Sequence, residues 1–390
     1  MGIDYDKVLT SKVKNIKPSG IRRFFDLADS VKDCITLGVG EPDFKTPWHV
    51  REEAIGALRR GNTRYTANAG TKELRAEISR YISRRFGLEY DPSCEIMVTV
   101  GGSEGIDAVI RTLIEPGDEV LIPEPSFVCY SPLAELAGGR AVVLPTYEKD
   151  NFRLRPDVLK NAITDKTKML ILPYPNNPTG AVMTRRDYDA VAEVIKDTDI
   201  IVLSDEIYIE LNYTEEPLCS FAEIDGMKER SVIVNGFSKA YAMTGWRMGY
   251  ILAPREILTQ ALKVHQYGIM SAPTISQFAA VDALKNGDED IIKMREMYNM
   301  RRKFLMESFK IMDIPCFEPL GAFYVFPNIS KFGFTSEEFC QKFLEKEKVA
   351  VVPGSAFGES GEGFVRISYA YSLEHLQKAI DRLYNFIRTI

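Results

Sequence analysis

Short apolar runs alternate with segments of helical periodicity through the middle of the chain. Seven runs of five to seven residues are rich in β-branched side chains and are bounded by Gly, Pro or Asp. Their nearly continuous apolar character is typical of strands that are buried on both faces. The runs are EIMVTV (95–100), EVLIP (119–123), AVVLP (141–145), KMLILP (168–173), IIVLSD (200–205), SVIVNGF (231–237) and MGYILAP (248–254).

Most of the intervening segments have the spacing of apolar residues that helices require, as in SEGIDAVIRTLI (103–114) and TRRDYDAVAEVIKD (184–197). Strands that alternate with helices predict a mostly parallel sheet with helices on both faces. We therefore expect an α/β fold in which a seven-stranded, mostly parallel sheet is sandwiched by helices.

The pattern changes after about residue 285. A long charged segment (288–312) has helical character, and it leads into three strand-like runs, GAFYVFPNI, VAVVPGSAFG and GFVRISYA, with helices expected near 335–347 and 372–389. This mixture predicts a smaller α+β domain. The first forty residues show no core of their own and are expected to pack on one of the domains. We expect a large domain over 45–285 and a small domain formed by 1–44 and 286–390.

Composition and charge narrow the class of protein. The chain has 390 residues, of which 45 % are hydrophobic and 27 % charged, as in ordinary soluble globular proteins. Its net charge of −6 argues against nucleic acid as a partner, because surfaces that bind phosphate backbones are basic. Six scattered cysteines without a CxxC pair and three histidines argue against a zinc site or a disulfide framework. Apolar runs are too short for a signal peptide or a membrane span, which favours the cytoplasm.

Polar residues follow several of the predicted strands, at the edge where open α/β sheets bind ligands. The turn 101–105 (GGSEG) opens a helix, and its backbone N–H groups suit one phosphate, although a glycine pair is a weak signal alone. Asn177 lies in PNNPTG, where it is either ordinary turn chemistry or an amide aimed at a ligand. Asp205 ends a buried strand, and Tyr208 follows three residues later; this acid is either a helix cap or the partner of a cation.

The stretch GFSKAYAMTGWRMGY (236–250) holds a lysine, Lys239, among small and apolar residues. A lysine without water around it has a depressed pKa and becomes a nucleophilic amine. Lysine, aspartate, asparagine, tyrosine and a phosphate-binding turn at successive strand ends together fit pyridoxal 5′-phosphate. The lysine would bond to the cofactor aldehyde, the aspartate would hold the proton on the ring nitrogen, and the amide and phenol would contact the ring hydroxyl.

At this point the chain resembles a known family. GFSKAYAMTGWRMG is similar to the lysine attachment motif of class I/II aminotransferases, which are pyridoxal-phosphate enzymes of fold type I. The resemblance extends along essentially the whole chain, in family order. The other similar blocks are LGVGEPDFKTP (37–47), RYTANAGTKELR (64–75), PEPSFVCY (123–130), PNNPTG (175–180), SDEIY (204–208) and GEGFVRISYA (361–370).

The resemblance implies a role for each matching residue. Lys239 is implied to be the attachment lysine and the proton shuttle, and Asp205 the partner of the ring nitrogen. Arg366 is implied to bind the substrate α-carboxylate as a bidentate fork, with Gly38 and Asn177 beside the substrate. The implied cofactor contacts are Gly102, Ser103 and Glu104 through backbone N–H groups to the phosphate, Arg247 as its charged clamp, Ser238 beside the lysine, Phe127 on the ring face, and Asn177 and Tyr208 on the ring hydroxyl.

The resemblance also implies an obligate homodimer, because the tyrosine that corresponds to Tyr65 reaches the phosphate in the neighbouring subunit of relatives. The implied substrates are an L-amino acid and a 2-oxo acid such as 2-oxoglutarate. Some relatives that use aspartate have a lysine at the position of Ser103, and this chain lacks it. SGIRRFFDLA (19–28), GAFYVFP (321–327) and the segment 352–370 are most similar in texture to prokaryotic aromatic or broad-range aminotransferases.

Several alternatives stay open. The same resemblance allows an aminotransferase specific for aspartate or for acylated diaminopimelate, and a β-lyase that acts on cysteine conjugates. A nicotinamide dehydrogenase shares the α/β sheet but would show no visible absorbance from a lysine-bound cofactor. A catalytically inactive binding protein would need no intact set of catalytic residues, and here every expected position is occupied.

Overall fold

The structure is a computed structural model that describes residues 2–18, 20, 21, 28, 31–215 and 219–390, so most of the block SGIRRFFDLA lies outside the described residues. Seven strands form one sheet in the order β2-β8-β7-β6-β5-β3-β4, and only β8 runs antiparallel to its neighbours. The predicted sheet is confirmed. Its strands are β2 (Ile96–Thr99), β3 (Glu119–Glu124), β4 (Arg140–Pro145), β5 (Thr167–Leu172), β6 (Ile201–Asp205), β7 (Ser231–Gly236) and β8 (Gly249–Leu252).

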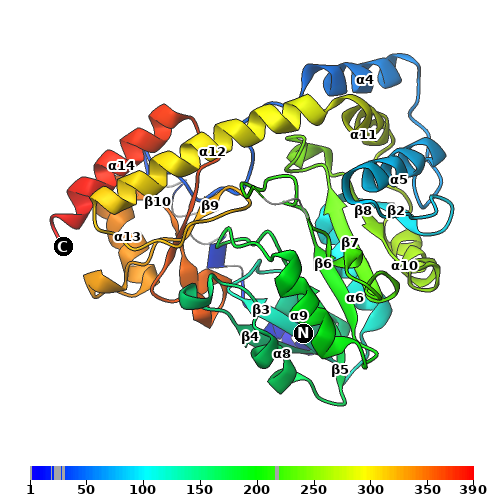
Figure 1. Cartoon of the computed structure of the whole chain (residues 1–390), viewed down its shortest axis with the longest axis horizontal. Coiled ribbons are helices and arrows are strands. Elements are labelled where there is room, and N and C mark those ends of the chain that lie inside the picture. Colours follow the sequence, from blue (N-terminus) through cyan, green and yellow to red (C-terminus); the bar gives the residue numbers. More distant parts are fainter. Residues whose placement is uncertain (1, 19, 22–27, 29–30, 216–218) are drawn as a thin grey trace.

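Helices cover both faces of this sheet (Figure 1). On β5, Met169 and Ile171 face α6, α7 and α10, whereas Leu170 and Leu172 face α8 and α9. This alternation buries both faces, because successive side chains of a strand point to opposite sides. The helices are α4 (Trp48–Arg59), α5 (Lys72–Phe86), α6 (Gly101–Leu113), α7 (Tyr130–Ala137), α8 (Pro156–Ala162), α9 (Arg185–Ile195), α10 (Arg255–Gly268) and α11 (Thr274–Asn286).

The strand β4 corrects one expectation. Its apolar run predicted burial on both faces, yet Val143 is 44 % exposed and Val142 is only partly buried. β4 lies at the edge of the sheet, beside β3 alone. The apolar run therefore indicates a strand but does not show that both faces of the strand are buried. An edge strand lacks the neighbour that would cover its outer side.

A second group of elements packs around its own hydrophobic core. The long helix α12 runs from α11 at one end to α13 and α14 at the other (Figure 1). The expected strands are confirmed but short, and VAVVPGSAFG forms two strands in different sheets. The division into domains at 45–285 and at 286–390 with 1–44 stays a prediction. The elements are β1 (Ile35–Thr36), α12 (Asp288–Ile311), β9 (Tyr324–Val325), α13 (Ser336–Glu347), β10 (Val349–Ala350), β11 (Val352–Pro353), β12 (Val365–Ser368) and α14 (Leu373–Ile387).

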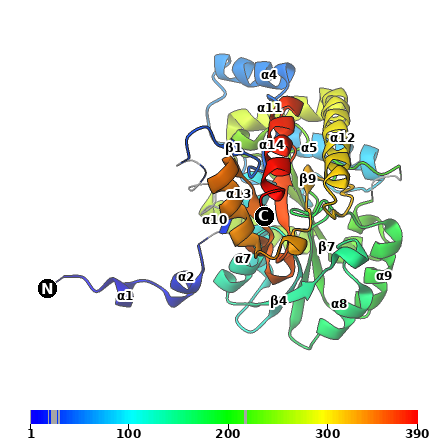
Figure 2. The same ribbon diagram turned by 90° about the vertical axis from the view of Figure 1, so that its left-hand side faces the viewer.

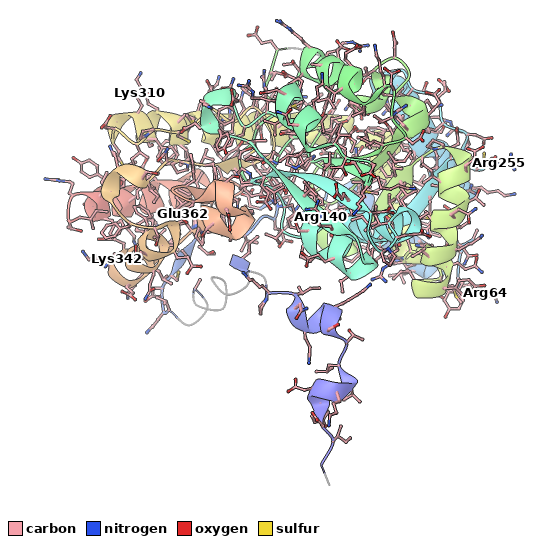
Figure 3. All side chains as sticks on the ribbon, turned by 90° about the horizontal axis from the view of Figure 1, so that it is seen from below. Arg64, Arg140, Arg255, Lys310, Lys342 and Glu362 are labelled. Atoms are coloured by element: carbon pink, nitrogen blue, oxygen red, sulfur yellow. The ribbon has the colours of Figure 1, made fainter. Side chains whose placement is uncertain are left out.

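The two parts of the N-terminal segment differ in how closely they pack on the rest of the chain. Residues of β1 pair in parallel with β10, so this part packs on the second group of elements as expected. Helices α1 (Tyr5–Val8) and α2 (Ser11–Asn15) bury no residue, and α1 projects from the body of the molecule (Figures 2 and 3). Helix α2 touches α7, where Lys12 Nζ donates to the carbonyl of Leu136 at 3.5 Å. Within the described residues, no helix is long and apolar enough to cross a membrane.

Candidate active site

One cavity of about 380 Å³ opens where the parallel strands end. This is the edge at which open α/β sheets bind ligands, because the loops that follow the strands converge there. Three residues expected from the sequence, Gly38, Glu104 and Tyr65, do not line it. The expected residues that do line it are Gly102, Ser103, Phe127, Asn177, Asp205, Tyr208, Ser238, Lys239, Arg247 and Arg366.

Lys239 follows β7 and points into the cavity. Its Nζ donates a hydrogen bond to the carbonyl of Gly40 at 2.6 Å and lies 5.6 Å from the ring centre of Tyr208. Burial lowers the pKa of Lys239 to about 8, although the carboxylate of Glu41 acts in the opposite direction. A larger fraction of this amine is therefore neutral and nucleophilic at physiological pH than for an exposed lysine.

Asp205 is the last residue of β6 and is buried in the cavity floor. Its Oδ2 accepts a hydrogen bond from the Tyr130 hydroxyl at 2.7 Å, and its Oδ1 accepts one from the backbone N–H of Ile207 at 3.2 Å. Burial raises the pKa of Asp205, while both hydrogen bonds and the charge of Lys239 lower it. The sequence did not single out Tyr130, although it ends the block PEPSFVCY.

Two buried phenols meet above the floor of the cavity. The hydroxyl oxygens of Tyr208 and Tyr324 lie 2.8 Å apart, and burial raises the pKa of both groups. The Tyr324 hydroxyl also lies close against Gly40, because a Cβ atom at this glycine would collide with it. Sequence reasoning missed Tyr324, because a tyrosine in the apolar run GAFYVFP looks like an ordinary core residue.

One end of the cavity is built to receive an anion. Helix α6 begins there, and its first backbone N–H groups have no partner within the helix. Gly101 has φ +75°, and a Cβ atom at this position would lie 2.5 Å from Nη2 of Arg247. Arg247 lies two residues before β8, whose antiparallel direction brings its amino end to the edge where the other strands finish. Its Nη1 donates to the carbonyl of Thr244 at 3.0 Å.

Glu104 lies in the first turn of α6, but its side chain is used elsewhere. Its Oε2 accepts a hydrogen bond from the backbone N–H of Val100 at 3.1 Å, and its Oε1 lies 3.1 Å from Nδ1 of buried His265. The carboxylate is therefore held by the protein itself. The role expected of Glu104 uses only its backbone N–H, and it stays a prediction.

Arg366 of β12 is only 2 % exposed and faces the cavity from the second group of elements. Its Nη1 donates to Oδ1 of Asn177 at 2.9 Å, its Nη2 donates to the carbonyl of Gly38, and its Nε has no partner. The guanidinium lies over the rings of Tyr324 and Phe357. Within the described residues no carboxylate pairs with it, so this fixed cation can bind the carboxylate of a ligand.

Tyr65 lies outside the cavity of a single chain and is 82 % exposed. Its loop is tied to the start of α11, since the Thr274 hydroxyl donates to the carbonyl of Arg64 at 2.7 Å. The role expected of Tyr65 requires a second subunit.

Fold and cavity together are typical of one class of protein: an α/β enzyme whose cavity at the strand ends holds a buried lysine, a buried carboxylate, a helix start and a buried arginine. Comparison with known proteins identifies the family. Residues 32–383 match the family Aminotransferase class I and II.

Relatives with this fold are similar over nearly their whole length. The chain is 44 % identical over 382 residues to an aspartate aminotransferase of Pyrococcus abyssi (97 % of this chain, 98 % of the relative). It is 42 % identical over 377 residues to aromatic-amino-acid aminotransferase 2 of Thermococcus litoralis (96 % and 97 %). The crystal structure of an aromatic aminotransferase from Pyrococcus horikoshii OT3 superposes with a TM-score of 0.90 at 44 % identity (95 % and 99 %).

The chain belongs to the class I and II aminotransferases, and its fold is fold type I. Members of this family depend on pyridoxal 5′-phosphate. The protein is therefore a pyridoxal-phosphate-dependent aminotransferase that transfers the amino group of an amino acid to an oxo acid.

Proposed function

We propose that the cavity binds pyridoxal 5′-phosphate with Lys239 as its covalent anchor. The observation that carries this proposal is the meeting, in one cavity, of an amine whose pKa burial lowers, a buried carboxylate without an ion-paired partner in the described chain, and an arginine with an unpaired Nε. The proposed cofactor contacts are Gly102, Ser103 and Glu104 (backbone), Arg247, Ser238, Phe127, Asn177, Tyr208 and Asp205, with Tyr65 from a second subunit.

The bound cofactor supplies a conjugated ring that accepts the electron pair left when the substrate Cα loses its proton. Lys239 would hold the cofactor, and its amine would move the proton at the substrate Cα. Asp205 holds a proton on the ring nitrogen. Arg366 binds the substrate α-carboxylate, and Asn177 and the carbonyl of Gly38 fix the plane of the guanidinium. The two groups of elements that bear Lys239 and Arg366 thus orient the bond at Cα.

We propose an aromatic or broad-range donor specificity, with 2-oxoglutarate or a similar oxo acid as acceptor. The side chains that line the cavity beyond the proposed anchors are largely apolar. Among the described lining residues the cations are Lys239, Arg247 and Arg366, and each already has a proposed role. The distal carboxylate of aspartate would therefore have no cation of its own in one chain. Specificity for aspartate or acylated diaminopimelate, and β-lyase activity, are the alternatives.

A screen of the first half-reaction tests this specificity. Each amino acid is added to the holoenzyme, and conversion of the cofactor to its amine form is followed by absorbance. We expect kcat/KM for tyrosine and phenylalanine to exceed that for aspartate about tenfold or more, because an uncompensated carboxylate costs more than 1.4 kcal/mol in an apolar site.

Ser103→Lys is the matched variant for this screen, since it supplies the missing cation. We expect it to raise the aspartate-to-tyrosine ratio of kcat/KM about tenfold. A wild-type preference for aspartate of a hundredfold or more contradicts the aromatic proposal. Release of pyruvate and ammonia without an oxo acid would instead support the β-lyase.

We propose that the active protein is a homodimer in which Tyr65 reaches the phosphate in the partner subunit. The support is a set of exposed apolar side chains on two linked segments: Asn68 donates to the carbonyl of Met270 at 2.7 Å, which joins the Tyr65 loop to a segment with exposed Tyr267 and Ile269. Large exposed apolar patches mark interfaces between proteins. The cytoplasmic location rests on the sequence expectation alone and is part of the proposal.

Mixed dimers test the position of Tyr65. Tyr65→Phe removes one hydroxyl, and we expect the affinity for the cofactor to fall about tenfold, as for the loss of a hydrogen bond to a charged group. A Tyr65→Phe subunit paired with a Lys239→Ala subunit should contain one intact site if Tyr65 acts across the interface. Equimolar mixing should then restore wild-type cofactor affinity at that site. Failure of the mixture to recover would show that Tyr65 does not act in the partner.

A further inference from the structure

Asp205 is a buried carboxylate whose charge has little compensation. In the described chain it forms no ion pair, and Lys239 acts on it only at a distance. The titratable groups that face it are Tyr130 and Cys129 at the start of α7, Tyr208 after β6 and Lys239 after β7. An isolated buried carboxylate tends to take up a proton, because desolvation disfavours the charged form.

We propose that Tyr130 is a positioning residue for the reaction: its hydroxyl holds Asp205 ionised and correctly oriented for the ring nitrogen of the cofactor. This inference rests on the proposed role of Asp205. The Tyr130 hydroxyl is the side-chain hydrogen-bond donor to this carboxylate, at 2.7 Å from Oδ2. That separation is an ordinary one for a hydroxyl donor and also falls within the range for a bond to a charged oxygen.

The hydroxyl acts as a donor over the whole pH range in which the enzyme works. Burial raises the pKa of Tyr130 well above its ordinary value, and the charge of Asp205 raises it further. The phenol therefore keeps its proton and stabilises the anionic form of Asp205. With Ile207 N–H bound to Oδ1 at 3.2 Å, the two donors fix the carboxylate from opposite oxygens and leave its remaining lone pairs for the cofactor.

The ring of Tyr130 also makes a packing contact that does not depend on its hydroxyl. It meets Phe127 edge to face, with ring centres 6.0 Å apart and planes at 84°, and it is 2 % exposed. Phe127 is the proposed neighbour of the cofactor ring. Because phenylalanine preserves this contact and removes only the hydroxyl, Tyr130→Phe isolates the effect of the hydrogen bond on Asp205.

The test follows the protonation of the ring nitrogen in the holoenzyme, using cofactor labelled with ¹⁵N at that atom and NMR titration over pH. Tyr130→Phe raises the pKa of Asp205, so Asp205 takes the shared proton for itself more readily and the ring nitrogen keeps it less well. We expect the pKa of the ring nitrogen to fall by about one to two units. We also expect kcat to fall about ten- to a hundredfold, with a change in KM of less than about threefold, because the effect lies in the reaction and not in substrate binding.

Tyr81→Phe is the matched control, since the Tyr81 hydroxyl also donates to a buried carboxylate, that of Glu210, outside the cavity. It should leave the ring-nitrogen titration unchanged. Replacement of Tyr130 by 3-fluorotyrosine keeps the side chain and strengthens its hydroxyl as a donor. It should shift the ring-nitrogen pKa upward, so a test remains even if Tyr130→Phe folds poorly.

Asp205→Asn distinguishes the proposed role of Asp205 from the inference about Tyr130. If this variant leaves ring-nitrogen protonation unchanged, the proposed role of Asp205 is overturned, and the role of Tyr130 with it. If Asp205→Asn removes the ring proton but Tyr130→Phe titrates like the wild type, only the inference on Tyr130 is overturned. A shift in Tyr130→Phe that Tyr81→Phe reproduces equally would also overturn it, since the effect would then be structural.

Discussion

Lys239→Ala is expected to lower the rate of transamination about ten-thousandfold or more. The change removes both the nucleophile that anchors the cofactor and the amine that moves the proton at Cα, and either function alone contributes several orders of magnitude. The variant should also lose the visible absorbance of the lysine-bound cofactor. Borohydride should attach the cofactor to the wild-type chain and leave it removable from the variant.

The matched control is Lys196→Ala, since Lys196 is an exposed lysine that pairs with Glu193 on the surface. Its activity and spectrum should equal those of the wild type. A visible band and borohydride attachment that persist in Lys239→Ala would contradict the assignment of the anchor. Absence of the band from the wild-type holoenzyme would contradict it as well.

Sequence periodicity predicted the sheet because the strands β2, β3 and β5 to β8 bury side chains on both faces, and burial of this kind leaves a continuous apolar run. It could not predict which strand lies at the edge. β4 has the same kind of run as its neighbours, but the exposure of Val143 depends on which strands pair, and that is a tertiary property. For the same reason it could not show that α1 and α2 bury no residue and that only α2 touches the body of the molecule.

The residues of the cavity, too, could be predicted from the sequence only in part. Residues at strand ends, such as Asp205 and Lys239, could be brought together from the order of the strands, because the carboxyl ends of parallel strands share one edge. Arg366 lies outside that sheet, and only the family resemblance pointed to it. Tyr130 and Tyr324 carry no local signal, since a buried tyrosine that contacts a functional group has the same sequence pattern as one that fills a core.

Arg366→Lys is expected to lower kcat/KM for amino acids about a hundred- to a thousandfold, mostly through a higher KM. A lysine is a point charge and cannot offer two parallel donors to a carboxylate, nor keep the hydrogen bonds of Arg366 to Asn177 and Gly38. Steady-state kinetics with the preferred donor measures the effect. Arg302→Lys is the control, because Arg302 is an equally buried arginine that binds Glu318 away from the cavity.

A donor without a carboxylate shows whether Arg366 binds that group. Phenethylamine matches phenylalanine except for the missing α-carboxylate. Its slow reaction with the cofactor therefore gains no rate from a contact with the Arg366 guanidinium. If Arg366 is the carboxylate partner, Arg366→Lys lowers the rate with phenylalanine and leaves the rate with phenethylamine within about threefold, because only the first substrate loses a transition-state contact. Equal losses with both amines would mean that Arg366 acts by holding the cavity in shape, and the carboxylate would then need another partner.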